Sequence, residues 1–207
     1  MPIKITQEHL EHARIPMAYW DVYLKKIPDT MPYKREVKIY LANMETFIKE
    51  GVGIYLWSEQ NSTGKTAIGT LALRRAMELG YSALYIPSDD YKEALINREM
   101  FSETETVQQR AMEVDVLLVD DVGKEYRQSS SGFAETKLQS LISYRAKHRK
   151  VTIFTSNIHP KELRTIYGND LAAMLQGCMK PIEVKGLDWN AIRQKEINAL
   201  FKQLDDK

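Results

Sequence analysis

The pattern of apolar and polar residues along the chain predicts strands that alternate with helices. Short apolar runs rich in β-branched residues have the composition of strands buried on both faces, and they occupy 54–57, 83–86, 114–119, 151–155 and 182–184. Helical spacing of apolar residues follows over 65–79, 88–112, the segment that ends near 145, and 189–204. This alternation predicts an α/β fold with a mostly parallel sheet and helices on both faces.

The first fifty residues differ from this pattern. They are rich in Tyr, Met and Lys and are interrupted by three prolines. Over 37–49, apolar residues that include Ile39 recur at helical spacing, which predicts one amphipathic helix. We therefore expect a small N-terminal helical segment ahead of the first strand.

The composition of the chain limits the class of protein but does not indicate a binding partner. The length of 207 residues is enough for one α/β domain with a sizeable core. The formal net charge is +1, so nucleic-acid binding would have to come from a local patch. Cys178 is the single cysteine and cannot form an internal disulfide, which fits a reducing, cytoplasmic setting. No run approaches the roughly 18–20 apolar residues that span a bilayer, so we expect no membrane association.

The loop between the first strand and its helix has the composition of a phosphate-binding loop, or Walker A motif. Gly64 lets the backbone approach a phosphate, Lys65 would reach the β- and γ-phosphates, and the Thr66 hydroxyl would ligate Mg²⁺. Backbone N–H groups at this helix N-terminus favour an anion. The residues expected to contact the nucleotide here are Ser62, Thr63, Gly64, Lys65, Thr66 and Ala67.

Two positions of this loop depart from the full phosphate-binding pattern. Glu59 stands where the pattern has its first glycine, and Ser62 stands where many relatives have another. A carboxylate near three phosphates is tolerable only if it points outward. The alternative interpretation is a chance Gly-Lys-Thr at a helix start.

A long apolar strand that ends in two carboxylates predicts a Walker B motif. Ligands of open parallel sheets bind at the carboxyl ends of strands, and two carboxylates there call for a cation. We expect Asp120 to hold Mg²⁺ through water and Asp121 to orient or deprotonate the attacking water. The alternative is a strand followed by an Asp-rich turn.

The fourth strand ends in Thr155, Ser156 and Asn157. Asn157 is the candidate sensor 1 residue, which would bond the γ-phosphate or position the water. Ser-Asn after a strand is also common in simple turns, so the order of the motifs carries this interpretation. That order predicts a P-loop NTPase of the AAA+/RecA (ASCE) branch, in which a further strand separates the Walker A and Walker B strands. No Asn-Lys-x-Asp motif for guanine is present.

Several segments resemble the DnaC/IstB family of AAA+ ATPases. Residues 116–125 resemble its Walker B signature, 138–145 its following helix, 151–157 its sensor 1 strand, and Ile15-Pro16 the start of its ATPase domain. The resemblance implies binding of ATP and Mg²⁺, loading of a replicative helicase in DNA replication, and contact with single-stranded DNA. The AAA+ ATPase domain is expected over 51–207. Residues 1–50 are expected to form a helical, partner-facing segment, with a partner surface on another chain as the alternative.

Two further residues take their expected roles from this resemblance. Arg193 stands near the position of a sensor 2 arginine that contacts nucleotide, although an exposed helix arginine is equally consistent with the sequence. Met174 stands where relatives carry an arginine finger, a group worth roughly 10³–10⁵ in rate. We therefore expect weak hydrolysis, and the missing finger puts a homo-oligomer in doubt.

Other surfaces and functions stay open at this stage. The basic run 145–150 is interpreted as a cationic helix C-terminus, with phosphate contact as the alternative. Aromatic and basic residues over 91–101 are candidates for base stacking or for the core. The competing functions are a transposase-accessory ATPase of IstB type and a scaffold that has lost turnover. A small-molecule kinase is disfavoured because the sequence lacks an arginine-rich lid.

Overall fold

The computed structural model describes residues 2–91, 102–123 and 133–205, so the predictions for 92–101 and for residues 124–125 of the Walker B-like segment lie outside it. Strands and helices alternate as the apolar pattern predicts. In chain order the elements are α1 (Gln7–His12), η1 (Met17–Tyr19), η2 (Leu24–Lys26), α2 (Lys34–Ala42), α3 (Met44–Glu50), β1 (Gly53–Trp57), α4 (Lys65–Glu78), β2 (Ala83–Pro87), α6 (Ser102–Glu113), β3 (Val116–Val122), α8 (Phe133–Lys147), β4 (Val151–Ser156), η3 (Pro160–Glu162), α9 (Leu163–Cys178), β5 (Met179–Glu183) and α10 (Trp189–Asp205).

The described strands form one parallel sheet in the order β2-β3-β4-β1-β5. The residues of β4 are all buried, and those of β1 and β3 nearly so, as expected for strands covered on both faces. β4 lies between β1 and β3, so a strand separates the Walker A and Walker B strands as predicted. The predicted α/β P-loop fold class is confirmed.

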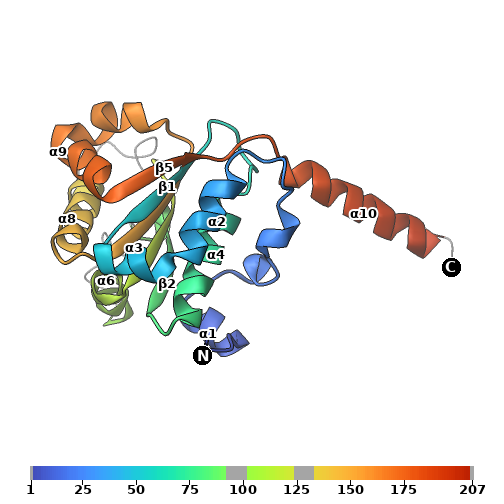
Figure 1. Cartoon of the computed structure of the whole chain (residues 1–207), viewed down its shortest axis with the longest axis horizontal. Helices are drawn as coiled ribbons and strands as arrows, with labels where there is room; N and C mark the ends of the chain where they lie inside the picture. The colour runs from blue at the N-terminus through green and yellow to red at the C-terminus, as the bar shows by residue number, and fades with distance from the viewer. Residues whose placement is uncertain (1, 92–101, 124–132, 206–207) are drawn as a thin grey trace.

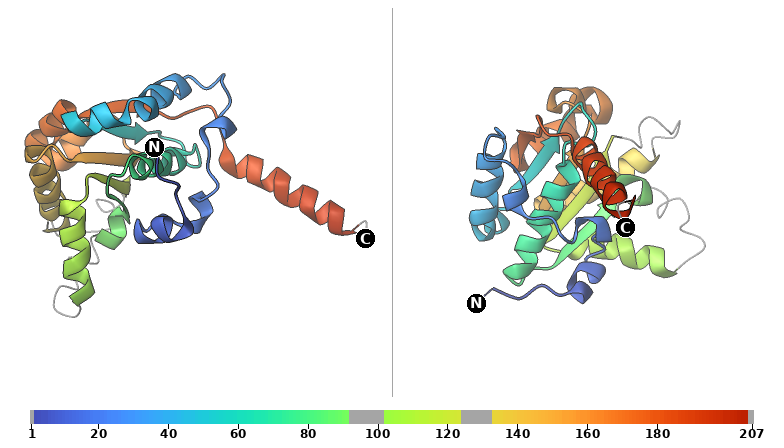
Figure 2. Two further views of the ribbon diagram at one scale, coloured as in Figure 1. Left: turned by 60° about the horizontal axis from the view of Figure 1, so that its bottom comes forward. Right: turned by 90° about the vertical axis from the view of Figure 1, so that its right-hand side faces the viewer.

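Helices cover both faces of this sheet (Figures 1 and 2). Successive residues of a strand point to opposite faces, so Ile54 packs in one apolar cluster and Tyr55 in the other. The first cluster joins the sheet to α2, α3 and α4, and the second joins it to α6, α8 and α9. The result is a three-layer α/β/α arrangement that leaves the carboxyl ends of the strands at one edge.

Two short helices, α2 and α3, occupy the region where one helix was predicted over 37–49. Asn43 separates α2 from α3 with φ −110° and ψ 24°, and its side-chain amide donates to the Ile39 carbonyl at 2.9 Å. Asparagine side chains compete in this way with the helical hydrogen bonds of the backbone. Ile39 was predicted on the apolar face but is 47% exposed, so that part of the prediction is wrong.

The N-terminal segment packs onto the same core as the sheet. Tyr33, Val37, Tyr40 and Met44 are buried in the first apolar cluster together with residues of β1 and α4. Arg74 of α4 ties down the loop after η1 by donating to two of its backbone carbonyls at 2.9 and 2.8 Å. The division of the chain near residue 50 stays a prediction.

α10 extends away from the rest of the chain (Figure 1), and its bounds confirm the helix predicted over 189–204. None of its described residues is buried, and Leu200, Phe201 and Leu204 are all more than half exposed. Among the residues that the structure describes, no helix combines the length and the apolarity needed to cross a membrane.

Candidate nucleotide-binding site

The carboxyl ends of β1, β3 and β4 bring together three segments that are far apart in the sequence. The phosphate-loop sequence follows β1, the two aspartates lie near the end of β3, and Asn157 follows β4. The Ser58 N–H donates to the Ser156 carbonyl at 3.1 Å and so joins the start of the loop to the end of β4. The sequence therefore predicted correctly which segments meet at this edge of the sheet.

The loop enters α4 through two residues with positive φ angles. Ser62 has φ 58° and Gly64 has φ 94°, which favours glycine at the second position. Lys65 is the first residue of α4 and is only 6% exposed, and its ammonium donates to the Gln60 carbonyl at 3.0 Å. Ala67 lies in the same first turn, where the free backbone N–H groups of a helix point toward its N-terminus.

Gly64 also faces the start of α10. A Cβ atom at Gly64 would lie 2.3 Å from the indole nitrogen of Trp189, closer than real atoms approach. The backbone N–H of Trp189 donates to the Ser62 carbonyl at 2.9 Å. Thus the first residue of α10 rests on the phosphate loop, and glycine is required at position 64 for space as well as for backbone conformation.

The carboxylate of Asp120 is surrounded by hydroxyl donors. Thr66 donates to its Oδ1 at 2.8 Å, Thr155 donates to the same oxygen at 2.5 Å, and Tyr85 donates to Oδ2 at 2.8 Å. Asp120 is 6% exposed. Burial raises the pKa of Asp120 above its ordinary value, as does the neighbouring Asp121 charge, while the three hydroxyls act in the opposite direction. A cation beside this buried carboxylate would be favourable.

Asp121 is set apart from Asp120 by a local irregularity of β3. Its φ is 59°, and the pairing of β3 with β4 shifts register between Val119 and Val122. The Asp121 N–H donates to the Thr155 hydroxyl at 2.8 Å, so one threonine bridges both aspartates. This bulge directs consecutive carboxylates to different places: Asp120 inward against Thr66, and Asp121 to the wall of an open cavity.

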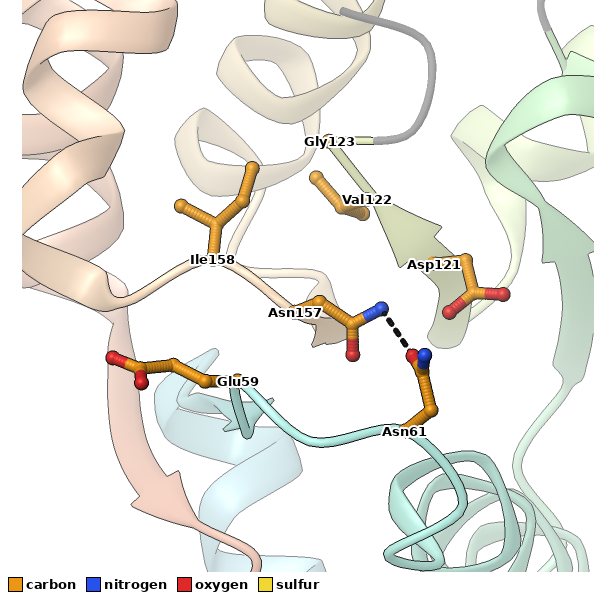
Figure 3. A pocket seen from close by; sticks show the side chains of 7 residues that line it. All are labelled: Glu59, Asn61, Asp121, Val122, Gly123, Asn157 and Ile158. Atoms are coloured by element: carbon orange, nitrogen blue, oxygen red, sulfur yellow. Dashed lines mark hydrogen bonds between the residues drawn. The ribbon is translucent and has the colours of Figure 1, made fainter. Parts of the chain in front are cut away.

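That cavity has a volume of about 250 Å³ and lies where Asp121, Asn61 and Asn157 approach one another (Figure 3). The Asn157 side-chain amide donates to Asn61 Oδ1 at 3.0 Å. The other amide atom, Asn157 Oδ1, is buried and has no hydrogen-bond partner among the described residues, and the same holds for the hydroxyl of Thr63. Unpartnered buried polar atoms are uncommon, and both lie in segments that were predicted to contact a nucleotide.

In the sequence, the presence of Glu59 was the main argument against a phosphate-binding site. Its side chain is exposed and lies on the rim of the cavity. Figure 3 shows its carboxylate directed away from Asn61 and Asp121. The carboxylate therefore leaves the loop interior to backbone groups and Lys65.

The structure does not bring Arg193 and Met174 to this cavity. Arg193 lies on α10, has an exposed side chain and pairs with Glu196 at 2.9 Å. Met174 lies on α9 and packs, half-buried, against the second apolar cluster. The sensor 2 role of Arg193 and the missing arginine finger remain predictions.

The basic run 145–150 contains a structural arginine. Arg145 is fully buried and donates to the Ala111, Val114 and Val151 carbonyls at 2.7, 2.9 and 2.6 Å. Burial lowers its pKa to about 9, still above neutral pH, so the guanidinium is charged. It joins the ends of α6 and α8 to β4. Arg145 therefore takes no part in the phosphate contact considered for 145–150, because its guanidinium N–H groups donate inside the protein. For the other residues of the run, that contact stays an alternative.

Sequence reasoning missed three residues at or near the site. Tyr85 was taken only as part of a buried strand, Thr155 as a strand end, and Trp189 as the start of a helix. Thr155 could have been recognised from its position two residues before Asn157, the candidate sensor 1 residue. Nothing in the local sequence pairs Tyr85 with Asp120, because residues 35 positions apart meet only through the strand order.

The polar groups at this edge of the sheet suit the binding of a nucleoside triphosphate and Mg²⁺. A buried lysine and the free N–H groups of a helix start suit phosphate oxygens, and a hydroxyl beside a carboxylate suits a magnesium ion, which prefers oxygen ligands. Lys65, Thr66 and Asp120 supply these groups.

Comparisons with known proteins were made at the levels of sequence and structure. No family profile and no curated protein matches this sequence. Among solved structures, the DnaC helicase loader aligns over 82% of this chain and 100% of its own, with a TM-score of 0.67 and 17% identity. DnaI aligns over 83% of this chain and 95% of its own, with a TM-score of 0.69 and 19% identity.

A replication protein of another kind shares the architecture. AMPPCP-bound DnaA from Aquifex aeolicus aligns over 87% of this chain and 56% of its own, with a TM-score of 0.62 and 21% identity. Structural similarity at sequence identities this low shows a shared fold alone. This chain has the P-loop AAA+ fold, with the architecture of the DnaC helicase loader and of DnaI.

Proposed function

We propose that this chain binds ATP and Mg²⁺ at the edge of the sheet where β1, β3 and β4 end. The observation that carries the proposal is the hydrogen bond from Thr66 to Asp120, which joins the predicted Walker A and Walker B motifs. The unpartnered Thr63 hydroxyl and Asn157 Oδ1 support it, since a bound triphosphate and its water would give both atoms partners.

Each site residue then has a defined task. Lys65 exchanges the Gln60 carbonyl for phosphate oxygens, while backbone N–H groups from Ser62 to Ala67 surround the β-phosphate. Asp121 accepts a hydrogen bond from the attacking water, and Asn157 holds the γ-phosphate or that water. Thr66 and Asp120 hold the Mg²⁺ ion, which neutralises charge on the phosphates when bound.

Isothermal titration calorimetry with ATP and Mg²⁺ tests this site. Lys65→Ala should abolish measurable binding, while Lys161→Ala, which removes an exposed lysine outside the loop, should bind as the wild type does. Equal ATP affinity in wild type and Lys65→Ala would remove the site assignment.

We further propose that the ATP-bound protein acts in DNA replication as a loader or adaptor for a replicative helicase in the cytoplasm. The sequence resemblance to the DnaC/IstB family supports this function, as does the fold shared with the DnaC helicase loader. Residues 1–50 are proposed as the partner-facing segment. Co-purification of the host's replicative helicase, with ATP and with EDTA, tests the proposal, and absence of the helicase in both conditions would contradict it.

Two other functions make different predictions. A transposase-accessory ATPase would hydrolyse ATP faster on duplex DNA and assemble on it, whereas a loader should prefer single strands. A scaffold that has lost turnover would bind ATP without hydrolysing it. Met174, packed against an apolar cluster at the expected finger position, favours slow hydrolysis.

A further inference from the structure

Tyr85 is the feature of the site for which neither the motifs nor the proposed function accounts. It lies on β2, outside both Walker motifs, yet its hydroxyl donates to Asp120 Oδ2 at 2.8 Å. We propose that Tyr85 is a positioning residue of the Mg²⁺ site, which fixes the orientation of the Asp120 carboxylate; this inference rests on the proposed function.

The three hydroxyls around Asp120 are divided unequally between its oxygens. Thr66 and Thr155 both donate to Oδ1, so they define one side of the carboxylate. Tyr85 donates to Oδ2 from the other side. With donors on both oxygens the carboxylate cannot rotate without breaking a buried hydrogen bond. Tyr85 therefore holds the plane of the carboxylate, with one oxygen facing Thr66, the other residue proposed to hold the ion.

Tyr85 is itself held in place by its backbone. It is paired with Leu118 in the β2–β3 register, and its N–H donates to the Ala13 carbonyl at 2.8 Å. Its side chain is 6% exposed. A hydroxyl on such a rigid strand is suited to orienting a neighbour, and the contact with Ala13 connects the N-terminal segment to the Mg²⁺ site through a single residue.

Loss of the Tyr85 hydroxyl should lower the affinity for Mg²⁺ more than the affinity for the nucleotide. Partners that orient a metal ligand typically contribute 10–100-fold to metal affinity. Lys65, which would hold the phosphates, donates to the Gln60 carbonyl within the loop after β1, whereas the Tyr85 hydroxyl donates to Asp120 on β3. Tyr85→Phe keeps the ring and its packing and removes only the donor.

The experiment is calorimetric titration of ATP into the full chain, in EDTA and across a series of Mg²⁺ concentrations. For Tyr85→Phe we expect the Mg²⁺ concentration that gives half of the affinity gain to rise about tenfold or more, with the affinity in EDTA unchanged. Tyr40→Phe is the matched control, because its buried hydroxyl donates to the Val52 carbonyl at 3.1 Å in the first apolar cluster. It should leave the Mg²⁺ dependence unchanged.

The outcomes separate this inference from the proposed function. If wild type gains no ATP affinity from Mg²⁺, the proposed function fails. If wild type gains affinity and Tyr85→Phe gains it at the same Mg²⁺ concentration, the role of Tyr85 is refuted. An equal loss of affinity in EDTA and in Mg²⁺ would also refute it, since that is the signature of a general structural defect. Thermal melting in EDTA monitors folding. Thr155→Val removes a donor to Asp120 Oδ1 together with the acceptor of the Asp121 N–H, and a Mg²⁺-specific loss is expected for this second variant as well.

Discussion

The Thr66 hydroxyl lies 2.8 Å from Asp120 Oδ1, although 54 positions separate the two residues in the sequence. Thr66 is the second residue of α4 and Asp120 lies near the end of β3, so these two elements must be aligned for the side chains to meet. The hydrogen bond therefore depends on the strand order β3-β4-β1, which places the acidic strand one strand away from the phosphate loop. It also makes Asp120 the natural starting point for tests of the site.

Asp120→Asn should stabilise the protein in the absence of nucleotide and Mg²⁺. The substitution removes a buried charge and keeps an oxygen for the surrounding hydroxyls. Each kcal/mol gained in the free energy of unfolding raises the melting temperature by roughly 2–4 °C in a domain of this size. Thermal melts in EDTA measure the gain, and addition of Mg²⁺ and ATP should stabilise the wild type far more than this variant.

The stability difference between Asp120→Asn and wild type should also depend on pH. The folded-state pKa of Asp120 is raised, so the penalty for burying its charge is complete above that pKa. It disappears as the pH falls through the folded-state pKa toward the unfolded value of about 3.9. Urea titrations from pH 7 downward should therefore show the advantage of the variant shrinking. A constant or growing advantage would mean that the charge of Asp120 is not the cause.

Arg145→Ala should destabilise the protein strongly without affecting nucleotide contacts. The loss leaves several buried carbonyl groups at the ends of α6, β3 and β4 without donors and creates a cavity. We expect a loss of about 3 kcal/mol or more in the free energy of unfolding, measured by urea denaturation. Lys147→Ala, on the exposed part of the same basic run, should change it by less than about 0.5 kcal/mol.

Gly64→Ala should lower both stability and ATP affinity, because φ 94° strains an alanine and its Cβ would overlap the Trp189 indole. Backbone strain of this kind costs about 1–3 kcal/mol. In the Gly64→Ala background, Trp189→Ala should restore the share of the stability that is lost to the overlap with the indole. The share that is lost to backbone strain should remain. Full additivity of the two single changes in thermal melts would show that the indole and position 64 do not interact.

Met174→Arg tests the expectation of slow hydrolysis. If the chain forms an oligomer, an arginine at this position should raise ATP turnover as protein concentration increases, since a finger acts on the neighbouring subunit. Its aliphatic stem can keep the packing contact of Met174 while the charged end reaches solvent. Steady-state ATPase assays across a range of protein concentrations measure the effect. Unchanged turnover at every concentration would weaken the missing-finger interpretation, and Met174→Lys controls for added charge.

The sequence by itself determined the fold class and the segments that form the site. Buried parallel strands are continuous apolar runs, so β1 to β4 were visible locally, and the carboxyl ends of such strands share one edge. Gly64, Lys65, Thr66 and Asp120 could be assigned because a phosphate loop and an acidic strand end have residue spacings that the local backbone imposes.

Only the tertiary structure decided which side chains support these residues. Tyr85 meets Asp120 because β2 pairs with β3, and Trp189 covers Gly64 because the chain returns after β5. Arg145 of α8 turns inward because carbonyl groups at the end of α6, between α6 and β3, and at the start of β4 face one place. These contacts join residues distant in sequence and depend on strand order and helix packing. A local pattern of apolar and polar residues records which face of an element is buried, but not which side chain from another element lies against it.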